Sequence, residues 1–166
     1  MMGGTSCGRE AKQGPGREET MKTNKALNAN KTEAREFQTP ASGIFFTVKD
    51  ILYEGRSKFQ RIEIIRNRDY GRVLFLDGLV QTTERDEFYY HEMLVHPAMA
   101  SHPRPAKVLI VGGGDGGALR EVLKHPVQKA WLVEIDGKVI EACREHFPWL
   151  RSTFRDPRAE LVVEDG

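Results

Sequence analysis

The stretch that decides the fold is KVLIVGGGDGGALREVLKH, residues 107–125. Its apolar run, residues 107–111, is typical of a strand buried on both faces of a parallel sheet. Residues 112–117 then meet the G-x-G-x-x-G spacing, and residues 118–124 have the composition of a helix. A glycine loop between a buried strand and a helix is a common binding place for a nucleotide. Taken alone, this motif is weak evidence.

Strand and helix patterns keep alternating downstream. Residues 131–135 predict a second buried strand, residues 138–147 a second helix and residues 161–163 a third strand. This order predicts an α/β fold with a parallel, doubly wound sheet of the Rossmann-like type. The sequence stops after the third strand, so we expect an N-terminal fragment that holds the first half of such a domain.

Upstream of the glycine loop, short β-rich runs alternate with turn signals and predict a small antiparallel sheet. The clearest signal is Asp77-Gly78, a favoured two-residue hairpin connection. Residues 88–100 then have helical spacing, although Pro97 must kink or split that helix. The β-rich runs are residues 44–48, 51–53, 59–65, 73–76 and 79–83.

The N-terminal residues have a different composition. Leu27 is the only Leu, Ile or Val among residues 1–36, and there is no aromatic residue in that segment. Such a segment cannot offset the entropy lost on ordering. The predicted organisation is a disordered leader over residues 1–40, an antiparallel β domain over residues 41–84 and a partial Rossmann-like catalytic domain over residues 85–166.

Composition excludes several functional classes. The chain has 166 residues and a net charge of +1, so it has no field that favours nucleic acid or a membrane surface. It has neither an apolar run of about 20 residues nor a secretory leader, and a cytoplasmic location is expected. Its two cysteines, Cys7 and Cys143, fit neither a disulfide framework nor a zinc spacing. Cys143 is expected to be a small buried residue of a helix.

An acidic residue follows the second parallel strand. Glu134 lies 20 positions after Gly114, where a carboxylate can accept hydrogen bonds from ribose hydroxyls. Together with Gly112 and Gly114 of the loop, it predicts a nucleoside-binding site. The alternative is a tight structural turn that happens to precede a surface acid.

Asp115 indicates which kind of nucleoside the predicted site would bind. Its carboxylate lies inside the loop that would otherwise hold a pyrophosphate, and like charges would repel. A dinucleotide is therefore disfavoured, and a cationic ligand such as a sulfonium nucleoside or an amine is favoured. The alternative is that Asp115 only caps the loop.

The segment HEMLVH, residues 91–96, superficially resembles the H-E-x-x-H zinc motif. Its second histidine, however, is at i+5, which places His91 and His96 about 140° apart around a helix. They cannot share one metal ion, and no metal site is predicted. Tyr89, Tyr90 and His91 could equally be packing residues with polar tips.

Two further positions are ambiguous on pattern alone. Gln60 lies in the strand-like run FQRIEII, where a polar residue can simply face solvent. Asp165 and Gly166 follow the third parallel strand, where open sheets of this kind have their ligand crevice, but the dipeptide is also a generic turn.

The chain from about residue 53 to residue 166 resembles the polyamine aminopropyltransferases, and most closely the bacterial spermidine synthases. The resemblance covers some 110 residues in several ordered segments, so it is far more specific than any single motif. Residues 1–40 have no part in it. The matching segments are YEGRSKFQRIEI, FLDGLVQTTERDEFYYHEMLVHPAM, KVLIVGGGDGGALREVLKH, VEIDGKVIE and DPRAELVVEDG.

This resemblance implies a β-strand domain followed by a Rossmann-like domain, in a homodimer or tetramer. It implies transfer of an aminopropyl group from decarboxylated S-adenosylmethionine, a co-substrate and not a resident cofactor, to a diamine such as putrescine. Gln60, Glu134 and the Asp165-Gly166 pair match positions that hold the adenosine part of the donor. Tyr90, His91 and Asp115 match positions around the amine or aminopropyl chain.

The resemblance also implies what this sequence lacks. The family's proton acceptor is an aspartate after the fourth parallel strand, beyond Gly166, so no catalytic residue is assigned here and the chain is expected to be inactive by itself. Two alternatives stay open. One is a methyltransferase that uses intact S-adenosylmethionine, and the other is a non-catalytic fragment whose β domain only mediates oligomerisation.

Overall fold

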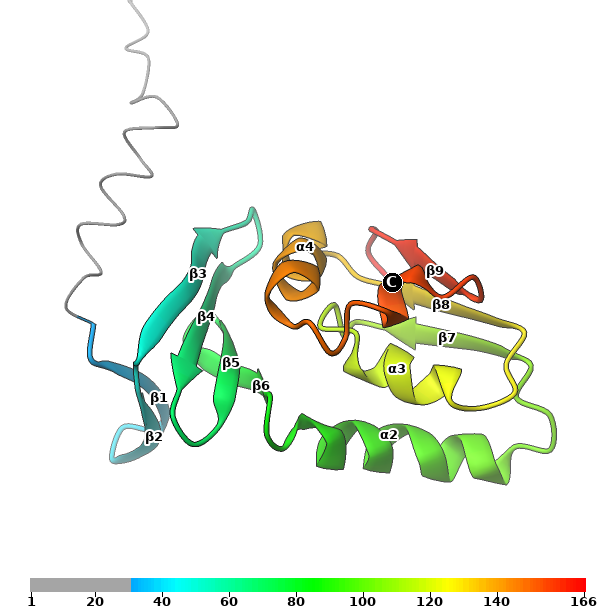
Figure 1. The fold of residues 1–166 in the computed structure, drawn as a ribbon, viewed down its shortest axis with the longest axis horizontal. Coiled ribbons are helices and arrows are strands. Elements are labelled where there is room, and N and C mark those ends of the chain that lie inside the picture. The colour runs from blue at the N-terminus through cyan, green and yellow to red at the C-terminus, as the bar shows by residue number, and fades with distance from the viewer. Residues whose placement is uncertain (1–30) are drawn as a thin grey trace, which may run out of the picture. The chain divides into compact units, whose positions relative to one another are not determined.

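The computed structural model describes residues 31–166 of the chain (Figure 1). An antiparallel hairpin comes first, followed by a four-stranded antiparallel sheet, a long helix and a parallel three-stranded sheet with helices in its connections. This order confirms the predicted α/β fold class. No helix in this described part is both long enough and apolar enough to cross a membrane.

The hairpin consists of β1 (Glu33–Thr39) and β2 (Ser42–Thr47). Strand β1 lies inside the predicted leader, so the expectation of disorder up to residue 40 is wrong at its C-terminal end. The sequence EAREFQT contains no Val, Ile or Leu, but backbone pairing with β2 and burial of Ala34 and Phe46 hold it in a strand. The rest of that leader, residues 1–30, lies outside the described residues.

The antiparallel sheet is a simple meander in the order β3-β4-β5-β6. Asp77 and Gly78, which join β5 to β6, both have positive φ, at 50° and 85°. Positive φ at both central residues is the requirement of the type I′ hairpin, and this confirms the prediction for the Asp-Gly pair. The strands are β3 (Asp50–Arg56), β4 (Arg61–Asn67), β5 (Gly71–Leu76) and β6 (Leu79–Thr83).

Both faces of this sheet are covered. Successive side chains along a strand point to opposite faces, and here each face packs against a different set of residues. Ile62, Ile64 and Leu74 face the main core, which they share with the helices of the parallel sheet. Ile65, Val73 and Phe75 face the other way and pack with Ala34 and Phe46 of the hairpin. The central strands of the sheet therefore join two cores.

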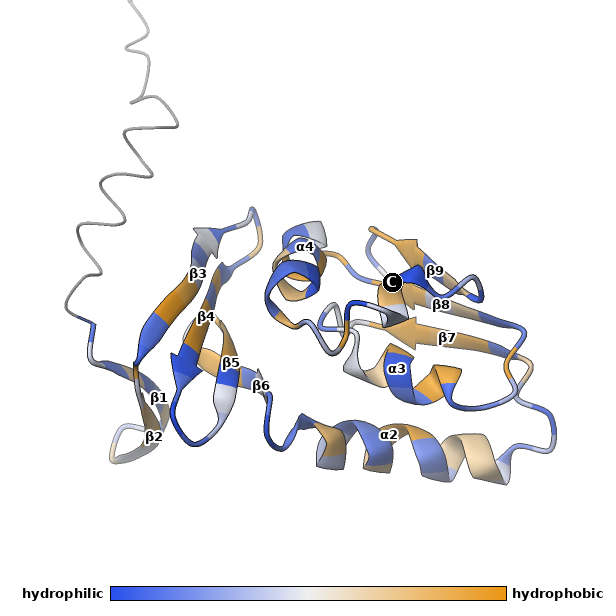
Figure 2. Cartoon of the chain, in the orientation of Figure 1, coloured by the Kyte–Doolittle hydropathy of each residue, from blue (hydrophilic) through white to orange (hydrophobic). Residues whose placement is uncertain are grey.

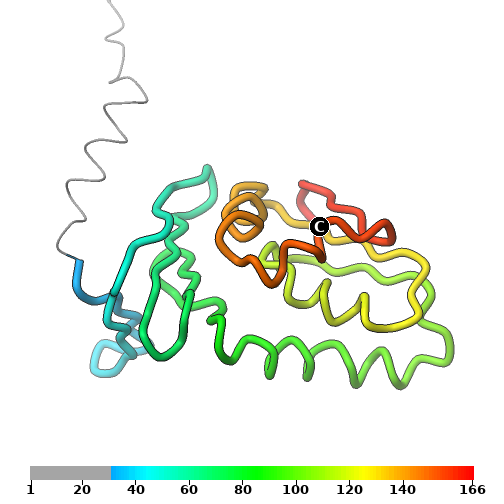
Figure 3. The backbone as a smooth tube through the Cα atoms, in the orientation of Figure 1, coloured from blue at the N-terminus to red at the C-terminus, as the bar shows by residue number. Residues whose placement is uncertain are grey.

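Helix α2 (Glu87–Ser101) is continuous, with Pro97 inside it. The prediction that Pro97 could split the helix is wrong in that respect. The proline stands in the last two turns of the helix, where Ser101 Oγ donates to the Pro97 carbonyl oxygen at 2.7 Å. In the tube of Figure 3 the chain runs along α2 from the antiparallel sheet and then turns back into the first parallel strand.

The parallel sheet has the order β7-β8-β9, with α3 and α4 in the two crossovers, as the strand and helix alternation predicts. Observed boundaries lie within about two residues of the predicted ones. The elements are β7 (Lys107–Val111), α3 (Gly117–Leu123), β8 (Lys129–Val133), α4 (Gly137–His146), a 3₁₀ turn at Thr153–Arg155, and β9 (Ala159–Val162).

Only one face of this sheet is covered, so the expectation of strands buried on both faces is wrong for the described chain. Ala130 and Leu132 share a core with residues of both α3 and α4, which places the two helices on one face. On the opposite face Leu109 and Val111 are 63% and 62% exposed. Figure 2 shows that β7 is mostly apolar. An apolar run does not by itself reveal whether a second layer covers it.

Candidate nucleoside and amine site

The candidate site lies where the three parallel strands end. The strands pair in register up to Val111, Val133 and Val162, so the residues that follow them lie along one edge of the sheet. This is the edge at which open parallel sheets bind ligands. The glycine loop, Glu134 and the Asp165-Gly166 pair, which the sequence singled out separately, all follow these strand ends.

Backbone conformation explains the glycines of the loop. Gly112, Gly113 and Gly116 have φ of +78°, +88° and +86°, a region that is unfavourable for residues with a side chain. Gly114 is needed for a different reason, since a Cβ there would lie 3.0 Å from Cγ of Glu134. The loop thus lets its backbone approach Glu134 closely.

Glu134 is buried and firmly held. Its Oε2 accepts a hydrogen bond from the Gly114 amide at 3.0 Å, and its Oε1 accepts one from the Asp136 amide at 3.0 Å. The structure therefore brings together Gly114 and Glu134, 20 residues apart in sequence. Because each carboxylate oxygen can accept two hydrogen bonds, Glu134 keeps acceptor capacity for the hydroxyls of a sugar.

Gln60 comes to this edge from the antiparallel sheet. Its Nε2 donates to Oδ2 of Asp136 at 3.0 Å, and Ser57 Oγ donates to the same oxygen at 2.6 Å. Asp136 is 2% exposed and also caps α4 by accepting from the Lys138 amide at 3.1 Å. Asp136 was not among the residues predicted from the sequence. Its position before a helix in IDGK is a capping signal that could have identified it.

A groove of about 650 Å³ lies beside this contact, within the usual size range of small-molecule sites. Asp165 lines it, and Gly166 is packed so closely that a Cβ there would lie 2.8 Å from Val111 Cγ1 and 3.3 Å from Val133 Cγ1. The Asp165-Gly166 pair therefore lies at the groove and over the strand ends. Its other lining residues include Ser57, Phe59, Ile135, Asp136 and Lys138.

Asp115 contacts both the loop and α2. Its Oδ1 accepts from the Gly117 amide at 2.9 Å, so the loop-capping role considered for it is real. Its Oδ2 lies 3.5 Å from Nε2 of His91, which is buried. A Cβ at Gly117 would lie 2.1 Å from Cε1 of His91, so only glycine lets the imidazole approach the loop in this way.

His91 lies between two carboxylates. Its Nδ1 is 2.6 Å from Oε2 of Glu87, on the other side of the ring from Asp115. Burial favours the neutral ring and lowers the pKa of His91, but Asp115 and Glu87 outweigh this effect and raise the pKa to about 9. At neutral pH the ring is therefore an imidazolium, and it partly neutralises Asp115.

Arg120 of α3 completes this network. It contacts both oxygens of Glu87, with Nη2 at 2.9 Å from Oε2. Burial raises the pKa of Glu87, but the hydrogen bonds from His91 and Arg120 outweigh it and lower the pKa to about 2. Neither Glu87 nor Arg120 was predicted from the sequence as a site residue. Glu87 lies one helical turn before His91, a spacing that could have indicated the pair, whereas nothing local connects Glu87 with Arg120.

Tyr90 is placed less centrally than the other candidates. Its side chain is 66% exposed and lines a separate hollow with Phe45, Tyr70 and Tyr89. Its ring meets the His91 ring edge-on, with centroids 5.3 Å apart. Its contact with the amine side of the site is therefore the ring contact with His91.

The remaining sequence candidates have other surroundings. His91 and His96 have different partners, since Nε2 of His96 faces Glu121 at 3.1 Å. This agrees with the rejection of a metal shared between the two rings. Cys143 is fully buried in α4, as predicted, and burial raises the pKa of its thiol.

Comparisons with known proteins agree with this arrangement. A family model described as "Spermidine synthase tetramerisation domain" matches residues 34–84, and one described as "Spermine/spermidine synthase domain" matches residues 87–166. The chain is 55% identical to polyamine aminopropyltransferase 1 of Hyperthermus butylicus over 126 residues, which is 75% of this chain and 43% of the relative. It is 48% identical to the Bacillus subtilis polyamine aminopropyltransferase over 132 residues, or 79% and 48% of the two chains.

Solved structures give the same result. The crystal structure of spermidine synthase from Thermotoga maritima superposes with a TM-score of 0.79 at 52% identity, covering 80% of this chain and 47% of that one. A spermidine synthase in complex with the transition-state analogue AdoDATO superposes with a TM-score of 0.78 at 52% identity, with the same coverage.

The fold defines a Rossmann-like protein, preceded by a β-strand domain, with a candidate site at the strand ends. The two family models follow one another along the chain and match this division. The chain belongs to the spermidine synthase family of polyamine aminopropyltransferases. It spans under half the length of the curated relatives named above.

Proposed function

We propose that these 166 residues form the donor-binding part of an aminopropyltransferase that converts putrescine into spermidine. The donor is decarboxylated S-adenosylmethionine, a co-substrate, and 5'-methylthioadenosine is the second product. The observation that carries the proposal is the contact between Glu134 and the Gly114 amide, next to the Asp115 and His91 pair. A nucleoside acceptor and a charged group for an amine thus lie on one loop.

The donor side of the proposal uses the strand-end edge. Glu134 would accept hydrogen bonds from the ribose hydroxyls, and Gly112 and Gly114 would let the nucleoside approach the backbone. Asp136 and Asp165 line the groove that would take the adenosine, and Gln60, which donates to Asp136, and Gly166, which follows Asp165, would lie beside it. We assign no metal ion and no resident cofactor to this chemistry.

The amine side of the proposal rests on Asp115, His91 and Tyr90. An amine attacks the carbon beside the sulfonium sulfur, the carbon–sulfur bond breaks, and its electron pair leaves with the neutral thioether. Only about one alkyl amine in 2,500 is unprotonated at pH 7. The His91 imidazolium disfavours a second cation beside it, so it favours the neutral amine, while Asp115 can accept a hydrogen bond from that amine.

The proton released by the amine needs an acceptor. Asp115 faces the His91 imidazolium and the Gly117 amide, which stabilise its charged form, and His91 is already protonated. We therefore propose that the acceptor is an aspartate in the part of the relatives that this sequence does not match. On this proposal the 166 residues bind the nucleoside but do not catalyse transfer.

The oligomer and the location are part of the same proposal. A homodimer or tetramer built through residues 34–84 is supported by the description of the family model that matches them. The balanced charge of the sequence supports neither nucleic acid nor a membrane surface as partner. Two cysteines that fit no disulfide framework support a cytoplasmic location.

Calorimetric titration of the chain with three nucleosides tests the proposal. We expect 5'-methylthioadenosine and decarboxylated S-adenosylmethionine to bind, and intact S-adenosylmethionine to bind at least about tenfold more weakly, because Asp115 disfavours a second carboxylate. Equal binding of the intact and decarboxylated donors would favour the methyltransferase alternative. No nucleoside binding by a folded chain would contradict the proposed site.

A further inference from the structure

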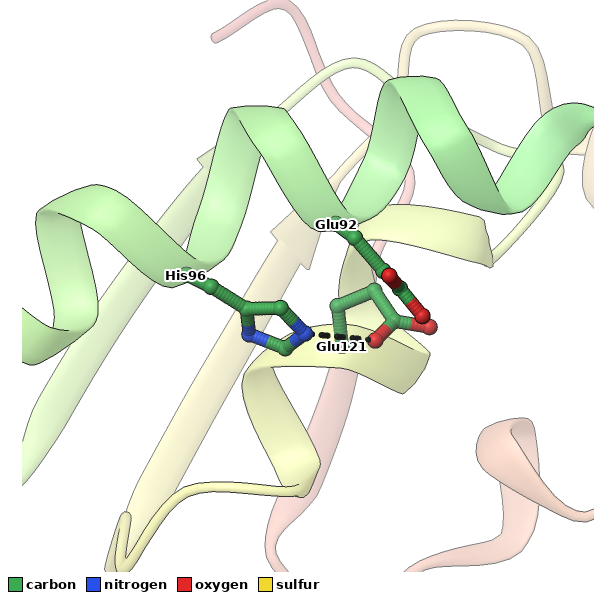
Figure 4. A group of neighbouring side chains, drawn as sticks. All are labelled: Glu92, His96 and Glu121. Atoms are coloured by element: carbon green, nitrogen blue, oxygen red, sulfur yellow. Dashed lines mark ion pairs between the residues drawn. The ribbon is translucent and has the colours of Figure 1, made fainter.

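Helices α2 and α3 present acidic and histidine side chains to each other away from the candidate nucleoside site (Figure 4). Glu92 and His96 lie one turn apart on α2. Glu121 lies on α3, and His125 follows just after that helix. The proposed aminopropyl transfer uses none of these residues.

Three of these side chains converge on one place. One ligand atom each from Glu92, His96 and Glu121 lies within 4.8 Å of the other two. Figure 4 shows His96 and Glu92 reaching from α2 toward Glu121, and Nε2 of His96 is 3.1 Å from Oε2 of Glu121. Two carboxylates and one imidazole form a ligand set that suits a divalent transition metal, with zinc as the natural candidate.

Burial distinguishes Glu121 from an ordinary surface acid. The residue is 0% exposed. Its Oε1 accepts a hydrogen bond from Nε of Arg120 at 2.6 Å, whereas its buried Oε2 has only ion-pair contacts, with Lys124 and with His96. A buried carboxylate oxygen in that state requires a cation beside it.

Lys124 supplies that cation in this structure. Its Nζ lies 2.5 Å from Oε2 of Glu121 and 3.8 Å from Oε1 of Glu92. The ammonium group therefore stands between the two carboxylates, where a metal ion would lie. The Lys124 side chain is 50% exposed, so it can withdraw into solvent without leaving a charge buried.

His125 gives His96 the outer partner that metal-bound histidines usually have. Nδ1 of His96 lies 2.9 Å from Nε2 of His125. When Nδ1–H of His96 donates to His125, Nε2 of His96 carries a lone pair directed at the Glu121 side. A hydrogen-bonded second nitrogen of this kind fixes the tautomer and orientation of a histidine ligand.

We propose that Glu92, His96 and Glu121 form a binding site for one divalent transition-metal ion, with His125 as the outer partner of His96 and Lys124 as the cation that the metal displaces. The two carboxylates balance the charge of the ion. The metal would link α2 to α3 and so fasten the helix that carries His91 to the one that follows the glycine loop.

Titration of the tag-free protein with zinc chloride, followed by calorimetry, tests this site, and Co²⁺ absorption serves as a second probe. We expect one equivalent of zinc, a tetrahedral-type Co²⁺ spectrum, and a rise in unfolding temperature on adding zinc. Glu92→Gln and His96→Gln should each weaken zinc binding by at least about tenfold. His102→Gln, which removes an exposed histidine beyond the end of α2, is the matched control and should change nothing.

Lys124→Met separates a metal site from a plain ion-pair cluster. If the ammonium group competes with the metal, this substitution should tighten zinc binding several-fold. If Lys124 is the permanent partner of Glu121, the variant should be less stable with and without zinc, and that result would overturn the proposal. Zinc binding that is absent, or that Glu92→Gln and His96→Gln leave unchanged, would also overturn it. Glu92 is partly exposed, so its substitution is compatible with folding.

Discussion

Nδ1 of His91 lies 2.6 Å from Oε2 of Glu87, one turn earlier on α2, and both side chains are buried. Arg120 donates to both carboxylate oxygens of Glu87, and Asp115 lies on the other side of His91. The amine side of the candidate site is therefore a network of alternating charges. Because the imidazolium is part of this network, Asp115 is a weaker cation attractor than its position in the loop suggests.

The network makes stability depend on pH. The pKa of His91 is raised to about 9, so the folded state binds this proton more tightly than the unfolded state, whose histidine titrates near 6.5. The stabilisation is thus fully present below about pH 6.5 and is lost as the pH rises through about 9. We expect the free energy of unfolding to fall by up to about 3 kcal/mol across that range, measured by urea denaturation.

Glu87→Gln tests the cause of that pH dependence. The substitution removes one of the two carboxylates beside His91, so the pKa of His91 should fall and the loss of stability should begin at lower pH. NMR titration of the His91 ring gives the pKa directly. An unchanged pKa in the variant would show that Glu87 does not hold the proton on this ring.

Asp115→Asn should separate amine recognition from nucleoside recognition. We expect the variant, in a chain that includes the whole catalytic domain, to weaken binding of the aminopropyl or amine group by about 1.5 to 3 kcal/mol, the scale of a hydrogen bond to a charged group. The affinity for 5'-methylthioadenosine should stay nearly constant. Asp50→Asn, an exposed aspartate on β3, is the matched control. Equal loss of both ligands would mean that Asp115 only shapes the loop.

Glu134→Gln should affect both nucleosides together. The amide keeps the size of the side chain but removes the charge that accepts hydrogen bonds from ribose hydroxyls and from Gly114. We expect weaker binding of the donor and of 5'-methylthioadenosine in calorimetric titrations, with no change in which diamine is preferred. Unchanged affinity for 5'-methylthioadenosine would place the nucleoside elsewhere.

Gly117→Ala tests the close approach of His91 to the loop. The new Cβ would lie 2.1 Å from Cε1 of His91, so either the ring or the loop must move, at a cost of about 1 to 3 kcal/mol in stability. Gly137→Ala is the matched control, since Gly137 also begins a helix but its nearest neighbour is a Val163 methyl at 3.2 Å. Thermal unfolding of the two variants should differ clearly. Equal stability would show that the His91 ring is not fixed there.

Local pattern is enough to predict most of this fold. The apolar run of β7, the glycine loop and the Asp77-Gly78 turn each contain their own signal, and their structures agree with it. Strand β1 has no such signal, because pairing with β2 and not its own composition holds it. Local pattern also gives no sign of the uncovered face of the parallel sheet. Leu109 on that face is exposed, but its residue type is the same as that of a buried strand residue.

Some residues of the candidate site could be predicted from the sequence, and others could not. Spacing along the chain identified Glu134 because the ends of adjacent parallel strands must meet. Arg120 could not be identified, because its contact with Glu87 joins residues 33 positions apart and exists only once α2 packs on α3. Asp136 was missed because its role as a partner of Gln60 depends on the antiparallel sheet reaching the strand ends.

The most direct test is to measure product formation by the 166 residues alone and by a chimera that joins them to the second half of the Thermotoga maritima enzyme. Each folded protein is incubated with decarboxylated S-adenosylmethionine and putrescine, and spermidine and 5'-methylthioadenosine are quantified by mass spectrometry. We predict equal amounts of the two products from the chimera and none from the 166 residues. A folded chimera that forms no spermidine would contradict the proposed function. So would turnover by the 166 residues alone within about tenfold of the chimera's rate, about 1.4 kcal/mol in activation free energy.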